Sequence, residues 1–287
     1  MRNTTRLKAL IAERRALTVP GVANALFARV AEEIGFPVVY ATGAGIANMQ
    51  LGAPDIGLTT LTEVACAVAG MADAVSLPII VDADTGFGNP VNMVRTVRVL
   101  ERAGAAGLQI EDQVFPKRCG HFAGKDVIPL DEMIQKIKAA VDSRNDADLQ
   151  IIARTDARAV EGLDRAIERA QRFAEAGADV TFVEAPLSIA ELERIAREVP
   201  VPQVANIVYG GRTPDPGRAA FAQMGFSIVL YANAALQAAL RASTRILSML
   251  KEDGCLENGS DLLATFEERQ RSVAKDAWDK IEVKYRG

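Results

Sequence analysis

Several short apolar runs of this 287-residue chain end in charged side chains that can do chemistry. Run 77–82 ends in Asp82, with Asp84 two residues further on, and run 107–111 ends in Glu111. Alternate residues of an extended chain face the same side, so both aspartates can meet Glu111 of a neighbouring strand. Such close carboxylates repel unless a cation joins them, and an all-oxygen set suits Mg²⁺, or Mn²⁺ as an alternative, better than zinc. The residues after Asp82 also fit a plain turn, which is the alternative interpretation.

A second reactive segment follows run 107–111. It reads Lys117-Arg118-Cys119-Gly120-His121 and contains the only histidine of the chain. Two cationic neighbours and an imidazole favour the thiolate, which makes Cys119 competent for proton transfer or nucleophilic attack. Gly120 allows the backbone to approach a ligand closely. The competing interpretation is a free buried cysteine beside solvated basic residues.

Polar residues end the other apolar runs as well. Tyr40 precedes Thr42-Gly43-Ala44-Gly45, and Arg154, Glu184 and Asn206 end later runs. Segment 43–48 half resembles a dinucleotide-binding loop, but its third glycine is missing, so a turn that offers N–H groups to an anion is favoured. No serine lies in a GxSxG motif, which argues against a serine hydrolase.

The elements that must position these residues alternate regularly along the chain. Between the apolar runs lie amphipathic stretches such as 92–103, 131–142, 163–176 and 189–199, and Gly104 and Gly177 end two of them as helix C-terminal glycines do. The apolar runs are 16–19, 37–41, 77–82, 107–111, 149–154, 179–184, 202–206 and 226–230.

Eight strand–helix units in about 250 residues predict an α/β fold, a (β/α)8 barrel of the TIM type, whose chemistry collects where the strands end. An open doubly wound sheet would show fewer strands and a nucleotide fingerprint. We expect a single domain over 1–287, with 253–287 as a C-terminal helical arm.

Composition excludes several classes of protein. The net charge is −4, and no basic block stands out, which argues against nucleic-acid binding. Three cysteines without CxxC spacing argue against a disulfide framework or a zinc knuckle. No uncharged apolar run reaches about 18 residues, so no membrane span is expected. The N-terminus lacks the features of a signal peptide, and a cytoplasmic protein is predicted.

The combined motifs resemble those of the isocitrate lyase/phosphoenolpyruvate mutase superfamily over roughly residues 5–250. The loop containing Cys119 is similar to the lyase branch, since the mutase branch typically lacks this cysteine. The segments that carry the resemblance are Tyr40-Ala41-Thr42-Gly43, residues 81–88, Ile110-Glu111-Asp112-Gln113, residues 117–121, Ala153-Arg154-Thr155-Asp156 and Glu161-Gly162-Leu163.

The resemblance implies a homotetramer, as a dimer of dimers in which the eighth helix is swapped between subunits, with Mg²⁺ and a small dicarboxylate substrate. Asp82 would hold Mg²⁺ directly, and Asp84 and Glu111 would act through its waters. Cys119 would be the acid/base. Thr42, Gly43, Ala44 and Arg154 would bind the substrate carboxylate, and Asp55, Lys117, Gly120, His121, Glu184 and Asn206 would complete the pocket.

Two segments bear on the substrate. The lyases usually have Ser-Gly-Gly where this chain has Thr42-Gly43-Ala44, and methylisocitrate lyases usually have a more polar segment than 122–125. Glu184-Ala185-Pro186 looks more like the dimethylmalate lyase and oxaloacetate hydrolase group.

We therefore expect cleavage of a 2-hydroxy dicarboxylate (a 2-alkylmalate, a 2,3-dialkylmalate or methylisocitrate) to an α-keto acid such as pyruvate plus a carboxylic acid. Tyr40 is the candidate base. The alternatives are an oxaloacetate hydrolase or decarboxylase, a C–P bond mutase or hydrolase, and a barrel that only binds dicarboxylates.

Overall fold

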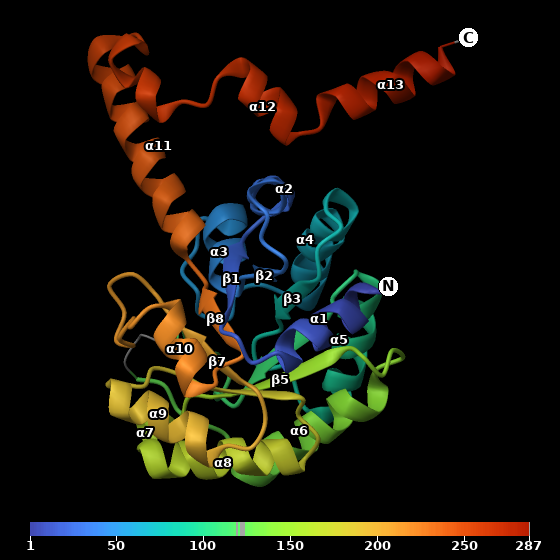
Figure 1. Cartoon of the computed structure of the whole chain (residues 1–287), viewed down its shortest axis with the longest axis vertical. Helices are drawn as coiled ribbons and strands as arrows, with labels where there is room; N and C mark the ends of the chain where they lie inside the picture. Colours follow the sequence, from blue (N-terminus) through green and yellow to red (C-terminus); the bar gives the residue numbers. More distant parts are fainter. Residues whose placement is uncertain (119, 121–123, 287) are drawn as a thin grey trace.

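Eight parallel strands close into a barrel in strand order β1 to β8, with β8 pairing back onto β1 (Figure 1). The computed structural model describes residues 1–118, 120 and 124–286. The predicted α/β barrel is confirmed, and each predicted apolar run overlaps a strand. The strands are β1 Leu17–Val22, β2 Val39–Ala41, β3 Ile79–Asp82, β4 Gly107–Glu111, β5 Gln150–Thr155, β6 Val180–Val183, β7 Gln203–Asn206 and β8 Ile228–Tyr231.

Helices surround the strands, and the four amphipathic stretches named from the sequence match helices to within two residues at each end. Those of the barrel are α1 Asn3–Ala12, α2 Ala25–Ile34, α3 Gly43–Ile46, α4 Leu61–Ala74, α5 Pro90–Arg102, α6 Leu130–Ser143, α7 Ala157–Val160, α8 Leu163–Glu175, α9 Ile189–Glu198 and α10 Arg218–Met224, with a short π-helical turn η1 at Ala47–Leu51.

Local sequence sets the helix ends. Asn89 caps the start of α5 by accepting hydrogen bonds from the N–H groups of Val91 and Asn92, and Pro90 takes the first helical position. Gly104 and Gly177, after α5 and α8, have φ of +105° and +102°. Glycine adopts this left-handed conformation without a steric penalty, so both predicted stop signals are confirmed.

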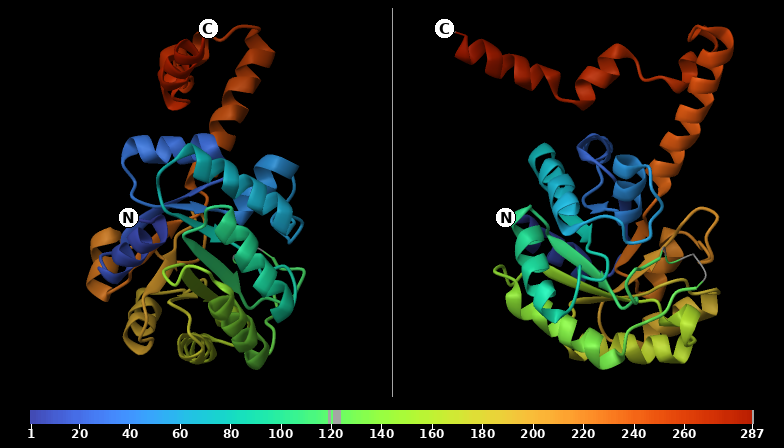
Figure 2. Two further views of the ribbon diagram at one scale, coloured as in Figure 1. Left: turned by 90° about the vertical axis from the view of Figure 1, so that its right-hand side faces the viewer. Right: turned by 180° about the vertical axis from the view of Figure 1, so that it is seen from behind.

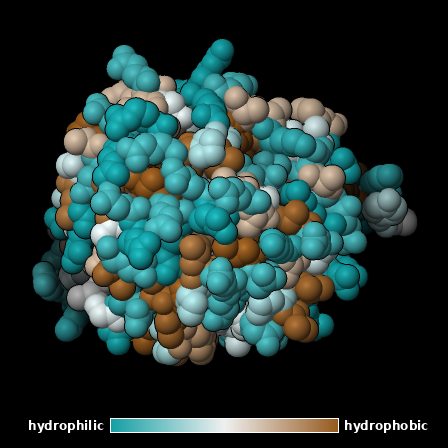
Figure 3. Space-filling model, turned by 90° about the horizontal axis from the view of Figure 1, so that it is seen from below, coloured by the Kyte–Doolittle hydropathy of each residue, from teal (hydrophilic) through white to brown (hydrophobic). Residues whose placement is uncertain are grey.

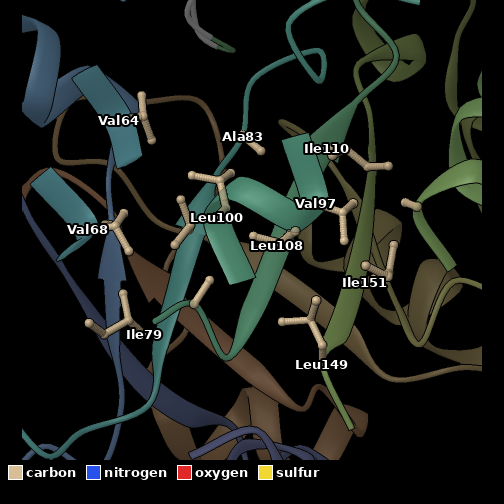
Figure 4. Packing of buried hydrophobic residues seen from close by; sticks show 14 of the residues in the cluster. Val64, Val68, Ile79, Ala83, Val97, Leu100, Leu108, Ile110, Leu149 and Ile151 are labelled. Atoms are coloured by element: carbon tan, nitrogen blue, oxygen red, sulfur yellow. The ribbon is translucent and has the colours of Figure 1, made fainter. Parts of the chain in front are cut away.

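The core has two layers because successive strand residues face opposite sides. Ile79, Val81, Leu108 and Ile110 point outward and pack with helix residues such as Val97 (Figure 4). The alternate residues point into the barrel, whose interior is filled by an apolar cluster that includes Ile80, Ile152, Phe182 and Val204, with Leu7 of α1 among them. The barrel is therefore a packed core, and the inward-facing charged residues Asp82, Glu111 and Arg154 come at or near the ends of their strands.

The last elements stand away from the barrel. They are α11 Ala234–Asp253, the 3₁₀ turn η2 Glu257–Leu262, α12 Phe266–Ser272 and α13 Lys275–Tyr285. All three views show α11 projecting from the end of β8, with α12 and α13 beyond it (Figures 1 and 2). We call residues 234–286 the arm; the projecting part thus includes α11 as well as the predicted tail 253–287.

The arm touches the barrel lightly beyond the start of α11. Arg271 of α12 forms an ion pair with Glu33 of α2 at 2.7 Å. The face of the barrel opposite the arm is mostly hydrophilic, with hydrophobic residues scattered in small patches (Figure 3). No helix in the described part of the chain has the length and hydropathy needed to cross a membrane.

Candidate active site

The alternation within the strands brings most of the predicted site residues to one pocket. Ile80 faces the barrel interior, so Asp82, two residues later on β3, faces the same way. Arg154 likewise lies two residues after the inward-facing Ile152 on β5. The pocket lies at the carboxyl end of the barrel and encloses about 430 Å³ of empty space, part of it open to solvent. Its lining includes the predicted residues Tyr40, Thr42, Ala44, Asp55, Asp82, Glu111, Lys117, Gly120, Arg154, Glu184 and Asn206.

Gly43 is the point where two predicted acidic residues meet. A Cβ on Gly43 would lie 3.0 Å from Asp82 Oδ2 and 3.3 Å from Asp84 Oδ1. Asp84 reaches this position with a φ of +48°, a left-handed conformation that aspartate adopts more readily than most residues. The N–H of Gly43 donates a hydrogen bond to Asp82 Oδ2 at 3.3 Å. The sequence analysis expected this N–H to bind the carboxylate of the substrate.

The three predicted metal carboxylates are buried, with exposed fractions of 8% for Asp82, 5% for Asp84 and 2% for Glu111. Two of them are paired with cations of the chain. Lys117 pairs with Asp84 at 2.9 Å, and Arg154 Nε lies 3.5 Å from Glu111 Oε2. Within the described residues, no three His, Cys, Asp or Glu side chains form a ready-made set of direct metal ligands. The sequence-based picture of one compact three-carboxylate cluster is thus too simple, because it left out these cations.

Burial dominates the titration of these groups. It raises the pKa of Asp84 to about 7, with Asp82 adding to the shift and Lys117 opposing it. Burial likewise raises the pKa of Glu111 well above its usual range, although Arg154 opposes the shift. The Glu111 Oε1 atom is buried and has no hydrogen-bond partner in the described structure. The pocket therefore has more buried negative charge than its own cations satisfy.

Lys117 joins the loop after β4 to the loop after β2. Its ammonium contacts the carboxylates of both Asp55 and Asp84, and its side chain is almost completely buried. Burial opposes the charged form, but Asp84, Glu111 and Asp82 outweigh it and raise the pKa of Lys117 well above its usual value. Lys117 is therefore a fixed cation, and Asp55 acts on the pocket through it.

Arg154 is held on one edge by Asp156. Its Nε and Nη2 donate to the two Asp156 oxygens at 2.9 and 3.1 Å, and its Cζ lies 5.2 Å above the ring of Phe182. Nη1 lies 3.9 Å from Glu184 Oε2 and makes no other polar contact with the described residues. Asn206 Nδ2 donates to the same Glu184 oxygen at 3.5 Å. The free edge of the guanidinium is thus available to an anion in the pocket.

Tyr40 lies deep in the pocket and donates its phenolic hydrogen bond to Gln109 Oε1 at 2.8 Å. Burial raises the pKa of Tyr40 well above its usual value, and the carboxylates of Asp82 and Glu111 add to the shift. In this structure Tyr40 is thus a hydrogen-bond donor, and its expected role as base stays a prediction.

The two most reactive residues predicted from the sequence, Cys119 and His121, lie outside the described residues. Gly120 between them is described. A Cβ on Gly120 would lie 2.4 Å from Arg154 Nη2 and 2.5 Å from Glu184 Oε1. The backbone of Gly120 thus packs directly against two pocket side chains, and a larger residue there would displace at least one of them.

Several pocket residues escaped the sequence analysis. Gln109 donates to Asp82 Oδ1 at 3.3 Å and accepts from Tyr40, and it lies two residues before Glu111 on β4. The period of two could have found Gln109, because it must face the same side as Glu111. Lys125 and Asp156 were missed because only the folded chain brings them together. The apolar wall was missed too; it comprises Phe182, Val208, Leu230 and Ala232.

Comparison with known proteins places this pocket in a family. The family model for phosphoenolpyruvate phosphomutase matches residues 7–251, most of the chain. The chain belongs to this family. It is an enzyme of the phosphoenolpyruvate mutase/isocitrate lyase superfamily, and its relatives include lyases.

Two curated relatives illustrate the similarity. The 2,3-dimethylmalate lyase of Eubacterium barkeri is 40% identical over 285 residues, which cover 99% of both chains. The 2-methylisocitrate lyase of Aeropyrum pernix is 46% identical over 259 residues, covering 90% of this chain and 83% of the relative.

Solved structures give the same result. A crystal structure of 2,3-dimethylmalate lyase superposes with a TM-score of 0.94 at 34% identity, covering 100% of this chain and 96% of the other. Oxaloacetate acetylhydrolase with the inhibitor 3,3-difluorooxalacetate gives 0.91 at 33% identity, with 96% and 95% covered. Phosphonopyruvate hydrolase in complex with oxalate and Mg²⁺ gives 0.89 at 29% identity, with 99% of each chain covered.

Proposed function

We propose that the chain is a metal-dependent carbon–carbon lyase that cleaves a 2-hydroxy dicarboxylate of the 2,3-dialkylmalate type to an α-keto acid and a carboxylic acid. The observation that carries this proposal is the pocket itself, whose lining combines the buried carboxylates of Asp82 on β3 and Glu111 on β4 with the guanidinium of Arg154. Near full-length similarity to 2,3-dimethylmalate lyase supports the dialkylmalate class.

The described residues fit a divalent cation. The available donors are all carboxylate oxygens, which suit Mg²⁺ with Mn²⁺ as an alternative. The unpartnered Glu111 Oε1 and the raised pKa of Asp84 both mark negative charge that a cation would satisfy. Mg²⁺ usually keeps several waters, so Asp82 as direct ligand, with Asp84 and Glu111 behind waters, is compatible with the absence of a three-ligand cluster among the described residues. When bound, the ion would stabilise negative charge on substrate oxygens.

The chain's own side chains bind and orient the substrate. Arg154 offers its Nη1 edge to a carboxylate, and Thr42 and Ala44 line the same pocket. Tyr40 lines the pocket as a hydrogen-bond donor to Gln109. Phe182, Leu230 and Ala232 provide an apolar wall for the alkyl groups of the substrate.

The proposed reaction is a retro-aldol type of cleavage. The substrate hydroxyl gives its proton to a buried carboxylate of the pocket, the C2–C3 bond breaks, and C2 becomes the carbonyl of the keto acid. The electron pair of the broken bond stays on C3, where Cys119 delivers a proton. Gly120 places the backbone next to Cys119 against Arg154 and Glu184, which supports this assignment for Cys119. His121 would complete the pocket from the same segment.

The test is release of α-keto acid from a panel of 2-hydroxy dicarboxylates in the presence of Mg²⁺. We expect turnover of dialkylmalates, loss of turnover in excess EDTA, and recovery when Mg²⁺ or Mn²⁺ is added back. Cys119→Ser and Cys119→Ala should lower turnover about 10²–10⁴-fold, the usual contribution of a positioned proton donor. Full turnover by either variant would remove Cys119 from the mechanism.

Hydrolysis of oxaloacetate is the second candidate, because the oxaloacetate acetylhydrolase structure superposes nearly as well. The same panel separates the candidates. A hydrolase releases oxalate, an oxaloacetate decarboxylase releases carbon dioxide, a C–P bond enzyme acts on a phosphonate, and a binding protein releases nothing.

We also propose that α11 is exchanged between subunits of a homotetramer. None of its 20 residues, all of them described, is buried, although Leu240 and Leu247 are apolar and 67% and 62% exposed. An amphipathic helix of this length needs a second surface to cover its apolar face. The cytoplasmic location expected from the sequence stays a prediction.

A further inference from the structure

Lys125 is a buried cation that the proposed reaction does not use. It belongs to the segment between β4 and α6, its side chain is 2% exposed, and that of Asp156 is fully buried. Its ammonium donates to Asp156 Oδ1 at 2.6 Å and to the backbone oxygen of Gly120. A buried ammonium is costly unless it is paired, so these two acceptors fix its position closely.

Asp156 is shared between two cations. The carboxylate that accepts from Lys125 also accepts from Arg154 Nε and Nη2. Its backbone N–H donates to Asp112 Oδ1 at 2.9 Å, and Thr155 Oγ1 donates to Asp112 Oδ2 at 2.7 Å, so Asp156 cannot shift easily. Two positive charges and one negative charge give the trio a net charge of +1, and the carboxylates of Glu111 and Glu184 lie 3.5 and 3.9 Å from its guanidinium. Without Lys125 the remaining pair would be neutral.

We infer that Lys125 is a positioning residue for Arg154. It balances the charge of Asp156, so that the guanidinium keeps its positive potential and its free Nη1 edge for a substrate carboxylate. It also holds Gly120 at the place where the backbone packs on Arg154 and Glu184. The inference rests on the proposed function only in assigning the anion at Arg154 to a carboxylate substrate.

The consequence can be measured without turnover. Oxalate is a small dicarboxylate suited to this pocket, and its affinity in the presence of Mg²⁺ can be determined by calorimetry. We expect Lys125→Met to weaken oxalate binding about ten- to hundred-fold, the size expected for a charge-assisted hydrogen bond. Lys125→Arg keeps the charge and should retain most of the affinity. Lys138→Met, the same change at an exposed lysine of α6, is the matched control and should bind like the wild type.

The double variant Lys125→Met/Asp156→Asn gives the decisive comparison. It restores the net charge of +1 because Arg154 then faces a neutral amide. We expect it to bind oxalate more tightly than Lys125→Met alone, by about three-fold or more, since part of a charge effect of this size is recovered. A residue that only stabilised the loop would give additive losses in binding. Thermal unfolding of each variant shows whether it is folded, and Lys125→Gln replaces Lys125→Met if the latter unfolds.

The outcomes separate this inference from the proposed function. Wild-type affinity in Lys125→Met, or an additive loss in the double variant, overturns the role of Lys125. Oxalate binding by the wild type without cleavage of any dicarboxylate defeats the proposed lyase and leaves the Lys125 result standing. A wild type that does not bind oxalate overturns both, because both place an anion against Arg154.

Discussion

The pocket and the arm depart from ordinary protein surfaces in opposite ways. In the pocket, Asp82, Asp84, Glu111, Lys117 and Arg154 are charged side chains withdrawn from water. On the arm, α11, α12 and α13 contain no buried residue, and apolar side chains such as Phe266 and Trp278 face solvent. Burying charge and exposing apolar surface both cost free energy. We interpret the pocket as a site for a cation and a substrate, and the arm as a surface for a second subunit.

The two regions should therefore respond to different changes in solution conditions. Small charged ligands should stabilise the pocket and leave the arm unchanged, whereas protein concentration should affect the arm and leave the pocket chemistry unchanged. Each substitution below removes one feature from one region, and the effect expected on activity or assembly decreases from the first to the last.

Asp82→Asn should have the largest effect. The substitution keeps the shape of the side chain and one of the two oxygens that accept from the N–H groups of Gly43 and Asp84, but it removes the charge that would hold the cation. We expect turnover to fall about a thousand-fold or more. Steady-state kinetics with Mg²⁺ and calorimetric Mg²⁺ binding measure the effect, and Asp73→Asn on the exposed side of α4 is the control. Unchanged Mg²⁺ affinity in Asp82→Asn would mean that the cation binds elsewhere.

Leu240→Glu/Leu247→Glu tests the arm. The two leucines lie seven residues apart on one face of α11, so both charges enter the surface that we expect a second subunit to cover. Each buried leucine contributes about 1.5–3 kcal/mol, so the pair should weaken association about a hundred-fold or more. Sedimentation analysis over a range of concentrations should show a smaller species than the wild type. Ser248→Glu, on another face of α11, should assemble normally; a monomeric wild type would refute the swap.

Gly120→Ala tests the close approach between the segment after β4 and the pocket. The new methyl group would lie within 2.5 Å of Arg154 Nη2 and Glu184 Oε1, so one of these groups must move. A displacement of about 1 Å in a catalytic group can cost about a hundred-fold, and we expect a loss of this order in kcat/KM. Gly70→Ala in α4 has open space around its Cβ position and should leave activity unchanged. Wild-type kinetics in Gly120→Ala would show that this segment takes another position during turnover.

The sequence predicted the fold better than it predicted the site. Short continuous apolar runs located every strand, because parallel strands are apolar on both faces and stand out from amphipathic helices. The polar ends of β3, β4 and β5 identified Asp82, Glu111 and Arg154, since a barrel brings those ends together whatever the side chains do. The sequence therefore predicted the features that the topology of a barrel determines by itself.

Pairing between distant residues could not be predicted in this way. Nothing in the spacing shows that Lys117 reaches back to Asp55, or that Lys125 shares Asp156 with Arg154. These pairs depend on loop conformation and side-chain rotamers, which have no period. The role of Tyr40 could not be predicted from spacing either. A phenol at a strand end acts as a base or as a hydrogen-bond donor according to its burial and the charges around it.

Tyr40→Phe should have the smallest effect, and it tests that distinction directly. If Tyr40 is a protonated donor, the variant loses one buried hydrogen bond to Gln109, and kcat/KM should fall about ten-fold without a change in the pH profile. If Tyr40 is the base, the loss should reach about 10²–10⁴-fold and an ionisation should vanish from the pH–rate profile. Tyr231→Phe, which removes a hydroxyl bonded to Asp215 at the partly exposed end of β8, is the matched control. Because Asp82 and Glu111 disfavour a tyrosinate beside them, we expect the smaller loss.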